Sequence, residues 1–262
     1  MAHAAIELEH VHVTYRTRDG LVEALRDISL RVEPNAFLTV VGPSGCGKTT
    51  LLKIVSGVLR PSRGRILLFG EDLSQARLEG KFGFVFQRPL LLPWRTAMGN
   101  VALTSEIVAK QLSREQRLER AREWLGLTGL QGFEDKYPHE LSGGMQQRVA
   151  LSRALSFHPQ ILLMDEPFAA LDEITREAMQ GELLKIWARI RSTILFVTHS
   201  IAEALLLSDR VVILSHRPGE ILETLDIPFE RPRAELLRGQ KEFVELVEHV
   251  RSKLRGPEGQ LG

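Results

Sequence analysis

Short uninterrupted runs of apolar residues recur along the chain. They are FLTVVG (37–42), ILLMDE (161–166), TILFVTH (193–199) and RVVIL (210–214). Such runs lack polar alternation, which is typical of strands in a parallel sheet whose two faces are both covered. Longer stretches with helical periodicity separate them. The pattern predicts an α/β protein with a parallel sheet in its core.

A second pattern surrounds the first of these runs. Apolar and polar residues alternate in AIELEHVHVTY (5–15), VEALRDISLRVE (22–33), GRILLFG (64–70) and KFGFVFQ (81–87). Alternation is typical of antiparallel strands with one solvated face. We expect these segments to form an antiparallel β region flanking the start of the core.

The middle of the chain, from about residue 88 to residue 155, has helical character. Ser113 followed by Gln116 fits a capping box, and Gly126 can end the helix that starts there. Between them, apolar residues repeat at helical spacing: Leu118, Ala121, Trp124 and Leu125. This stretch is predicted to be an inserted α-helical subdomain.

The C-terminal part has a proline-marked polar segment, IPFERPRAE, and then a terminal helix. One apolar stripe runs along that helix: Phe243, Leu246, Val247, Val250 and Leu254. The stripe favours packing on the chain's own core; contact with a second copy or a regulatory role are the alternatives.

The composition indicates which partners and which cellular compartment to expect. The 262 residues are 44% hydrophobic and 26% charged, which predicts a folded globular chain. Lys plus Arg (34) nearly balances Asp plus Glu (33), so no nucleic-acid partner is expected. Three features favour a cytosolic protein: a single cysteine, no signal-peptide pattern and no apolar run of roughly 20 residues. If it works at a membrane, another chain should span the bilayer.

The strongest chemical motif is GPSGCGKTT, which directly follows the first apolar run. It consists of Gly42, Pro43, Ser44, Gly45, Cys46, Gly47, Lys48, Thr49 and Thr50. The spacing fits the phosphate loop G-x-x-x-x-G-K-[ST] between a strand and a helix. Glycines let backbone N–H groups turn toward phosphate oxygens, Lys48 reaches the β- and γ-phosphates, and Thr49 offers a hydroxyl to Mg²⁺. We interpret Cys46 as a small residue at a variable position rather than a redox switch.

Two carboxylates end the run ILLMDE. Asp165 is placed to hold Mg²⁺ through water, and Glu166 to orient or deprotonate an attacking water. Helix capping is the structural alternative, but a phosphate loop upstream favours catalysis. His199 closes TILFVTH and is expected at the same sheet edge as a γ-phosphate sensor, with a structural histidine as the alternative.

Five motifs together resemble the nucleotide-binding subunit of an ATP-binding-cassette (ABC) transporter. They are the phosphate loop, LSGGMQ (141–146), ILLMDEP (161–167), ALD (170–172) and VTH (197–199). The resemblance covers roughly residues 6–225. It implies a P-loop NTPase core with a parallel sheet, a flanking antiparallel β subdomain and an inserted α-helical subdomain. Residues 1–225 would form the nucleotide-binding domain, and residues 226–262 a C-terminal linker and amphipathic helix.

The resemblance also implies roles for residues outside the phosphate loop. Tyr15 would stack on adenine, although a tyrosine on an alternating strand is often only a half-buried aromatic. Gln87 would link Mg²⁺ and the attacking water to the helical subdomain, and Asp172 would signal across a dimer. The remaining nucleotide-binding residues implied are Ser142, Gly143, Gly144 and Gln146. In a head-to-tail pair with a second copy, Ser142 and Gly144 would cap the γ-phosphate held by the other copy's Lys48, whereas a plain helix cap is the simpler alternative.

A membrane partner is implied as well. Four apolar residues follow Gln87: Leu90, Leu91, Leu92 and Trp94. They form either a docking cleft for a transmembrane permease or packing against the helical subdomain. The segments LLPWRT, DRVVILSHRPGEI (209–221) and IPFERPR resemble importer cassettes for nitrate, alkanesulfonates, taurine and related small anions. Such a cassette would lie peripherally on the cytoplasmic face of the inner (plasma) membrane and act indirectly with a substrate-binding protein.

Other classes fit the chain less well. A DNA-repair or chromosome ATPase needs a long coiled coil, and the 92 residues between Thr50 and Gly143 leave no room for one. A small-molecule P-loop kinase lacks a segment like LSGGMQ. A lipid or efflux ABC system remains the nearest alternative, followed by a non-transport ABC ATPase. One departure is Ser200, which follows His199 where the importer group usually has aspartate.

Overall fold

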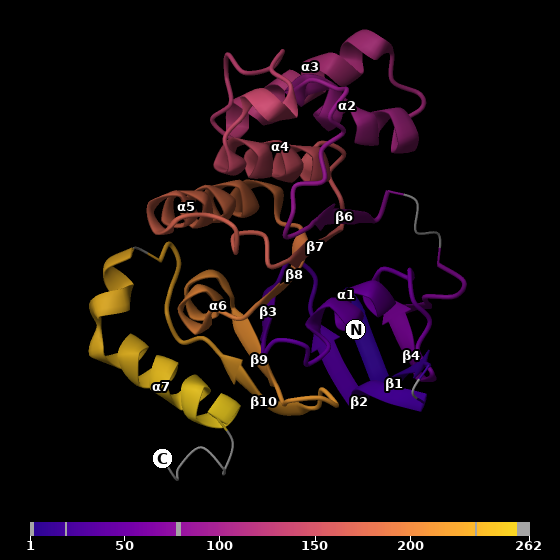
Figure 1. The fold of residues 1–262 in the computed structure, drawn as a ribbon, viewed down its shortest axis with the longest axis vertical. Coiled ribbons are helices and arrows are strands. Elements are labelled where there is room, and N and C mark those ends of the chain that lie inside the picture. The colour runs from indigo at the N-terminus through magenta and orange to yellow at the C-terminus, as the bar shows by residue number, and fades with distance from the viewer. Residues whose placement is uncertain (1–2, 19, 77–79, 234, 256–262) are drawn as a thin grey trace. The chain divides into compact units, whose positions relative to one another are not determined.

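A computed structural model describes residues 3–18, 20–76, 80–233 and 235–255. The chain divides into two compact units, which are described separately. The first unit comprises Met1–Ala76 and Thr193–Gly262, and the second comprises Arg77–Ser192 (Figure 1).

The first unit contains an antiparallel sheet in the order β2-β1-β4-β5. Its strands are β1 (Ile6–Thr17), β2 (Gly20–Val32), β4 (Arg63–Leu68) and β5 (Glu71–Asp72). Ile6 lies opposite Val32 on one side and Leu68 on the other. Three of the four segments predicted from alternation therefore form antiparallel strands.

The first unit also contains the strands that position the phosphate loop. β3 (Phe37–Val41) pairs in parallel with β8 (Thr193–Thr198) and with β9 (Arg210–Leu214), and β10 (Ile221–Asp226) runs antiparallel to β9. Every residue of β3 and β8 is buried. The prediction of parallel strands covered on both faces is confirmed for these three runs.

Among its described residues, the first unit has three α-helices: α1 (Lys48–Val55), α6 (Ile201–Leu207) and α7 (Lys241–Arg255), with the short η2 (Glu235–Gly239) before α7. Phe243 and Val250 of α7 are buried in one apolar cluster with Leu205 of α6 and Val211 of β9. The apolar stripe of the terminal helix thus packs on its own chain, as its sequence favoured, and Figure 1 shows α7 beside α6.

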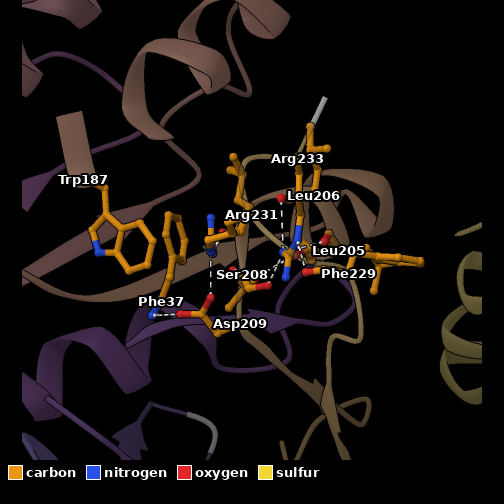
Figure 2. A network of polar contacts seen from close by, with 12 residues as sticks. Phe37, Trp187, Leu205, Leu206, Ser208, Asp209, Phe229, Arg231 and Arg233 are labelled. Carbon is orange, nitrogen blue, oxygen red and sulfur yellow. Dashed lines mark hydrogen bonds and ion pairs between the residues drawn. The ribbon is translucent and has the colours of Figure 1, made fainter. Parts of the chain in front are cut away.

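Two arginines attach the segment before α7 to the end of α6 (Figure 2). Arg231 donates from Nε to Asp209 Oδ1 (2.8 Å), and Asp209 Oδ2 accepts from the Phe37 N–H (2.9 Å). Arg233 donates to carbonyl oxygens at the end of α6: those of Leu205, Leu206 and Ser208. Burial, with the nearby Arg231 charge, lowers the pKa of Arg233 to about 10. Cations at a helix C-terminus satisfy its last carbonyls, so this pair holds the C-terminal extension in place.

The second unit contains β6 (Phe82–Val85) and β7 (Ile161–Asp165), which pair in parallel with Phe82 opposite Ile161. The prediction that residues 81–87 add an antiparallel strand is wrong. Alternation indicates that one face of a strand is less buried than the other, which is true of β6. It does not indicate the direction of the neighbouring strand.

The helices of the second unit are α2 (Ala97–Val108), α3 (Arg114–Leu127), α4 (Gly143–Leu155) and α5 (Glu173–Ile190), with the short η1 (Pro138–Glu140). Figure 1 shows α2, α3 and α4 packed together. Ser113 and Gln116 form the predicted capping box. The predicted stop at Gly126 is wrong: α3 continues through Leu127, and the residue with left-handed φ (70°) is Gly129. Within the described ranges, no helix has the length and apolar character needed to cross a membrane.

Candidate functional site

The phosphate loop, Gly42 to Thr50, connects the end of β3 to the start of α1. Gly45 and Gly47 adopt φ values of 76° and 110°, a region that residues with a Cβ rarely occupy. A Cβ on Gly47 would lie 2.6 Å from Leu25 Cδ2 and 2.9 Å from the Ala24 carbonyl oxygen. Glycine at this position is therefore required both by the backbone conformation and by the space.

Lys48 is folded back over the loop. It is 6% exposed, and its Nζ donates to the carbonyl oxygens of Gly42 (2.8 Å) and Pro43 (2.9 Å). The N-cap of α1 is Gly47, which has no side chain with which to cap the helix. A buried ammonium group and an uncapped helix start make this loop a strong site for an anion. The glycine cradle and the lysine fit the triphosphate that the motif predicts.

Tyr15 and His199 belong to the same unit as the phosphate loop. The Tyr15 hydroxyl lies 3.1 Å from Thr50 Oγ1, which places this ring beside the start of α1. Val41 lies opposite Thr198 in the parallel pair β3–β8, so Gly42 and the exposed His199 leave the sheet at one edge. Ser200 serves as the N-cap of α6, a role that the aspartate usual in the importer group would also fill.

A segment that the sequence identified only as a subfamily marker also contacts the loop. Arg217 Nε donates to the Gly45 carbonyl oxygen at 3.3 Å. Gly219 approaches so closely that a Cβ there would lie 2.2 Å from the Cys46 carbonyl oxygen. The available signal was a Pro-Gly pair just after a buried strand, at the carboxyl edge where α/β sheets bind ligands.

The second unit holds the predicted catalytic carboxylate. Val85 lies opposite Met164, so Gln87 leaves β6 at the same edge at which Asp165 and Glu166 end β7. Glu166 has φ 45°, an uncommon value for a residue other than glycine. A left-handed conformation costs about 1–3 kcal/mol and tends to occur at functional sites. Asp165 and Glu166 are both partly buried, whereas Gln87 is exposed.

The LSGGMQ segment forms the start of α4. The Ser142 hydroxyl accepts the Met145 N–H at 3.3 Å and so acts as the N-cap. Gly143 is exposed, and no described atom outside its own turn lies within 4 Å of where its Cβ would be. Gln146 behaves differently, because its amide donates to the carbonyl oxygens of Pro138 (2.9 Å) and Leu141 (3.1 Å).

Asp172 is the N-cap of α5, where its carboxylate accepts the Thr175 N–H at 3.0 Å. This hydrogen bond lowers the pKa of Asp172. Thr175 also lies next to the start of α4, because a Cβ on Gly144 would be 2.8 Å from Thr175 Cγ2. The second unit therefore brings Asp172 close to the LSGGMQ segment.

The start of the apolar segment after Gln87 is held by α4. Arg153 donates to the carbonyl oxygens of Leu90 and Pro89, both at 2.8 Å. Leu90 (56% exposed) and Trp94 (71% exposed) reach the surface, whereas Leu91 and Leu92 are partly buried. Trp94 borders a groove of about 530 Å³ that Tyr137 and Leu118 also line.

A family model described as ABC transporter matches residues 25–169. An uncharacterized ABC transporter ATP-binding protein of Methanocaldococcus jannaschii is 49% identical over 228 residues, 87% of this chain and 84% of that protein. The taurine import ATP-binding protein of Rhizobium johnstonii is 42% identical over 259 residues, 97% of each. A solved dimeric ATP-binding cassette in a post-hydrolysis state, bound to ADP and Pi, has a TM-score of 0.77 and 32% identity, covering 86% of this chain and 100% of that one.

Proposed function

The chain belongs to the ABC transporter family as an ATP-hydrolysing cassette, and we propose that it powers an importer for a small anion such as taurine, an alkanesulfonate or nitrate. The observation that carries the ATPase is the phosphate loop, with its enclosed glycine cradle and the buried Lys48. Import is supported by the relative named for taurine import, which aligns over 97% of both chains. That alignment favours an importer over a lipid or efflux system. We assign residues 1–225 to the nucleotide-binding domain and residues 226–262 to a C-terminal extension.

ATP binding is assigned first to the phosphate loop. Backbone N–H groups of the loop and of the first turn of α1 would bind the phosphates, and Lys48 would exchange its carbonyl partners for the β- and γ-phosphates. Tyr15 would stack on the adenine, and its position beside Thr50 supports this role.

We assign hydrolysis to residues that follow the carboxyl ends of β6, β7 and β8. Glu166 would orient the attacking water and accept its proton, while Gln87 would position that water. His199 would donate a hydrogen bond to the γ-phosphate. Mg²⁺, when bound, would neutralise charge on the phosphate oxygens. Its ligands from this chain would be the Thr49 hydroxyl, Gln87 and Asp165.

The open start of α4 supports a second copy as partner. Ser142, Gly143 and Gly144 would present N–H groups and the positive end of α4 to the γ-phosphate of the other copy. Asp172, beside this helix start, would relay the state of one site to the other. The related cassette is dimeric in a solved structure, which supports a head-to-tail ATP sandwich.

The surface after Gln87 supports a transmembrane permease as the second partner. Leu90 and Trp94 are large exposed apolar side chains, and Trp94 lines a groove, which is the expected character of a docking surface. A cassette bound there would lie peripherally on the cytoplasmic face of the inner (plasma) membrane. A substrate-binding protein would act on it only through the permease.

The test is the solution mass of Glu166→Gln by light scattering after size exclusion, with and without ATP and Mg²⁺. Because this variant should bind ATP without cleaving it, we expect the mass to double when ATP and Mg²⁺ are added. Ser142→Arg in the same background is the control and should stay monomeric. The proposed site shared between two copies would be contradicted by a Glu166→Gln variant that binds ATP but stays unpaired, both alone and when it is assembled with its permease.

A further inference from the structure

Residues 215–220, which connect β9 to β10, form a loop that is fixed within the first unit. We refer to them as the 215–220 loop. The Gly219 N–H donates to the Ala24 carbonyl oxygen (2.9 Å), and the Arg26 N–H donates to the Gly219 carbonyl oxygen (3.0 Å). Ser215 closes the loop by accepting the Glu220 N–H at its Oγ (2.9 Å). The loop is therefore held to β2 on one side and at its own base on the other.

The 215–220 loop packs directly on the phosphate loop. A Cβ on Gly219 would lie 2.2 Å from the Cys46 carbonyl oxygen, so only glycine permits this approach. Just before the loop, Leu214 lies within 3.2 Å of where a Cβ on Gly42 would be. The start and the middle of the phosphate loop thus meet this part of the chain, and a side chain of the 215–220 loop can act on the nucleotide site.

Arg217 is the side chain that reaches the phosphate loop. Its Nε donates to the Gly45 carbonyl oxygen at 3.3 Å, and its Nη2 lies 3.7 Å from where a Cβ on Gly45 would be. The peptide between Gly45 and Cys46 is planar, so fixing the carbonyl also fixes the direction of the Cys46 N–H. That N–H donates to the Pro43 carbonyl oxygen at 3.3 Å, within the same loop.

We propose that Arg217 is a further positioning residue for ATP binding. It holds the Gly45–Cys46 peptide in the conformation that the phosphate loop needs, and it places a permanent positive charge next to the polyphosphate. A guanidinium group suits this task because it stays charged at all working pH values and its planar fork of N–H donors matches phosphate oxygens. The inference rests on the proposed ATP-binding function.

The primary test is the affinity of Arg217→Ala for ATP, measured by calorimetry, and the KM and kcat of its ATPase activity. We expect the Kd and KM for ATP to rise by about fivefold to tenfold, in line with the loss of one solvent-exposed hydrogen bond of ordinary strength. The kcat at saturating ATP should stay within about twofold, because Arg217 acts on binding and not on the attacking water. Arg217→Lys keeps the charge but loses the Nε donor, so its Kd should fall between those of the wild type and the alanine variant.

The matched control is Arg210→Ala. Arg210 is a half-buried arginine at the start of β9, and its Nε pairs with Asp226 of β10 (2.8 Å) instead of reaching the phosphate loop. Its removal should leave the Kd for ATP unchanged. The Kd difference between wild type and Arg217→Ala should shrink as salt is raised, because salt screens exposed charges.

Two results would overturn the proposal. One is an Arg217→Ala variant with the wild-type melting temperature and a Kd for ATP within twofold of the wild type. The other is an equal loss of affinity in Arg210→Ala, which would reduce the effect to net charge. A wild-type protein that failed to bind ATP would instead contradict the proposed function itself.

Discussion

Two helices of this protein begin with glycines, but their surroundings differ. α1 starts after Gly47, where a Cβ would collide with Leu25 and Ala24, and its first residue Lys48 is buried. α4 starts after Ser142, its cap is a neutral hydroxyl, and the adjoining Gly143 is exposed with open space around it.

The difference shows how the environment of a helix start decides what it can bind. Both starts carry backbone N–H groups and the positive end of a helix dipole. The start of α1 is enclosed by its own unit, which suits a ligand that the chain holds by itself. The start of α4 is open, which suits a ligand that arrives on another molecule. Four substitution experiments test this contrast.

The largest effect is expected at the enclosed start. Lys48→Ala removes the ammonium group that would bind the β- and γ-phosphates, and hydrogen bonds to charged groups contribute about 1.5–3 kcal/mol each. We expect ATP affinity to fall by about 100-fold or more and hydrolysis to disappear. Lys53→Ala, in the exposed last turn of the same helix, is the control and should behave as wild type. Calorimetry with ATP and a phosphate-release assay measure both quantities, and retained affinity in Lys48→Ala would contradict the role of the lysine.

The open start should separate binding from hydrolysis. Ser142→Arg fills the space in which a partner's γ-phosphate would lie, so we expect ATP affinity within about twofold of wild type and loss of turnover. Ser113→Arg introduces the same side chain at the N-cap of α3 and should leave turnover within about twofold. Parental turnover in Ser142→Arg would show that α4 of one copy does not complete the site of another.

The two glycines should differ in their effect on stability. Gly47→Ala places a Cβ at φ 110° and 2.6 Å from Leu25 Cδ2, whereas Gly143→Ala adds a methyl group to open space at a helix start. We expect Gly47→Ala to lower the melting temperature by about 5 °C or more, since 1 kcal/mol corresponds to about 2–4 °C for a chain of this size. Gly143→Ala should change it by less than about 2 °C. Equal shifts in calorimetric scans would remove the distinction between an enclosed and an open start.

The sequence predicts elements that depend on local patterns. The runs at 37–42, 193–199 and 210–214 are buried parallel strands, because an uninterrupted apolar run requires cover on both faces. The prediction of antiparallel pairing for residues 81–87 is wrong, because β6 pairs in parallel with β7, which is distant in the sequence. The predicted stop at Gly126 is wrong because α3 continues through Leu127, and the left-handed φ lies at Gly129, past the C-cap residue Thr128.

The candidate site likewise has one part that the sequence predicts and another that only the fold reveals. The phosphate loop is contiguous, so its residue types alone reveal it. Arg217 and Gly45 are 172 positions apart, and Arg153 is 63 positions from Leu90. No local pattern encodes such pairs. They depend on strand order and on helix packing, which the fold supplies.

The smallest effect concerns the charge of a helix cap beside the open start. Asp172 caps α5 with a carboxylate, and its hydrogen bond to the Thr175 N–H lowers its pKa, whereas the hydroxyl cap of α4 at Ser142 does not titrate. A lowered folded-state pKa means that the stabilisation is complete above the unfolded value of about 3.9 and is lost as the pH falls through the folded value. Asparagine is an equally good N-cap without charge. Asp172→Asn should therefore melt slightly below wild type at pH 6, and the gap should narrow once the pH falls below the unfolded value and close below the folded-state pKa. Ser142→Asn, the matched control, should differ from wild type by a constant amount over the same range. Thermal scans at closely spaced pH values measure both gaps, and a pH-independent gap for Asp172→Asn would mean that the carboxylate charge adds nothing to this helix start.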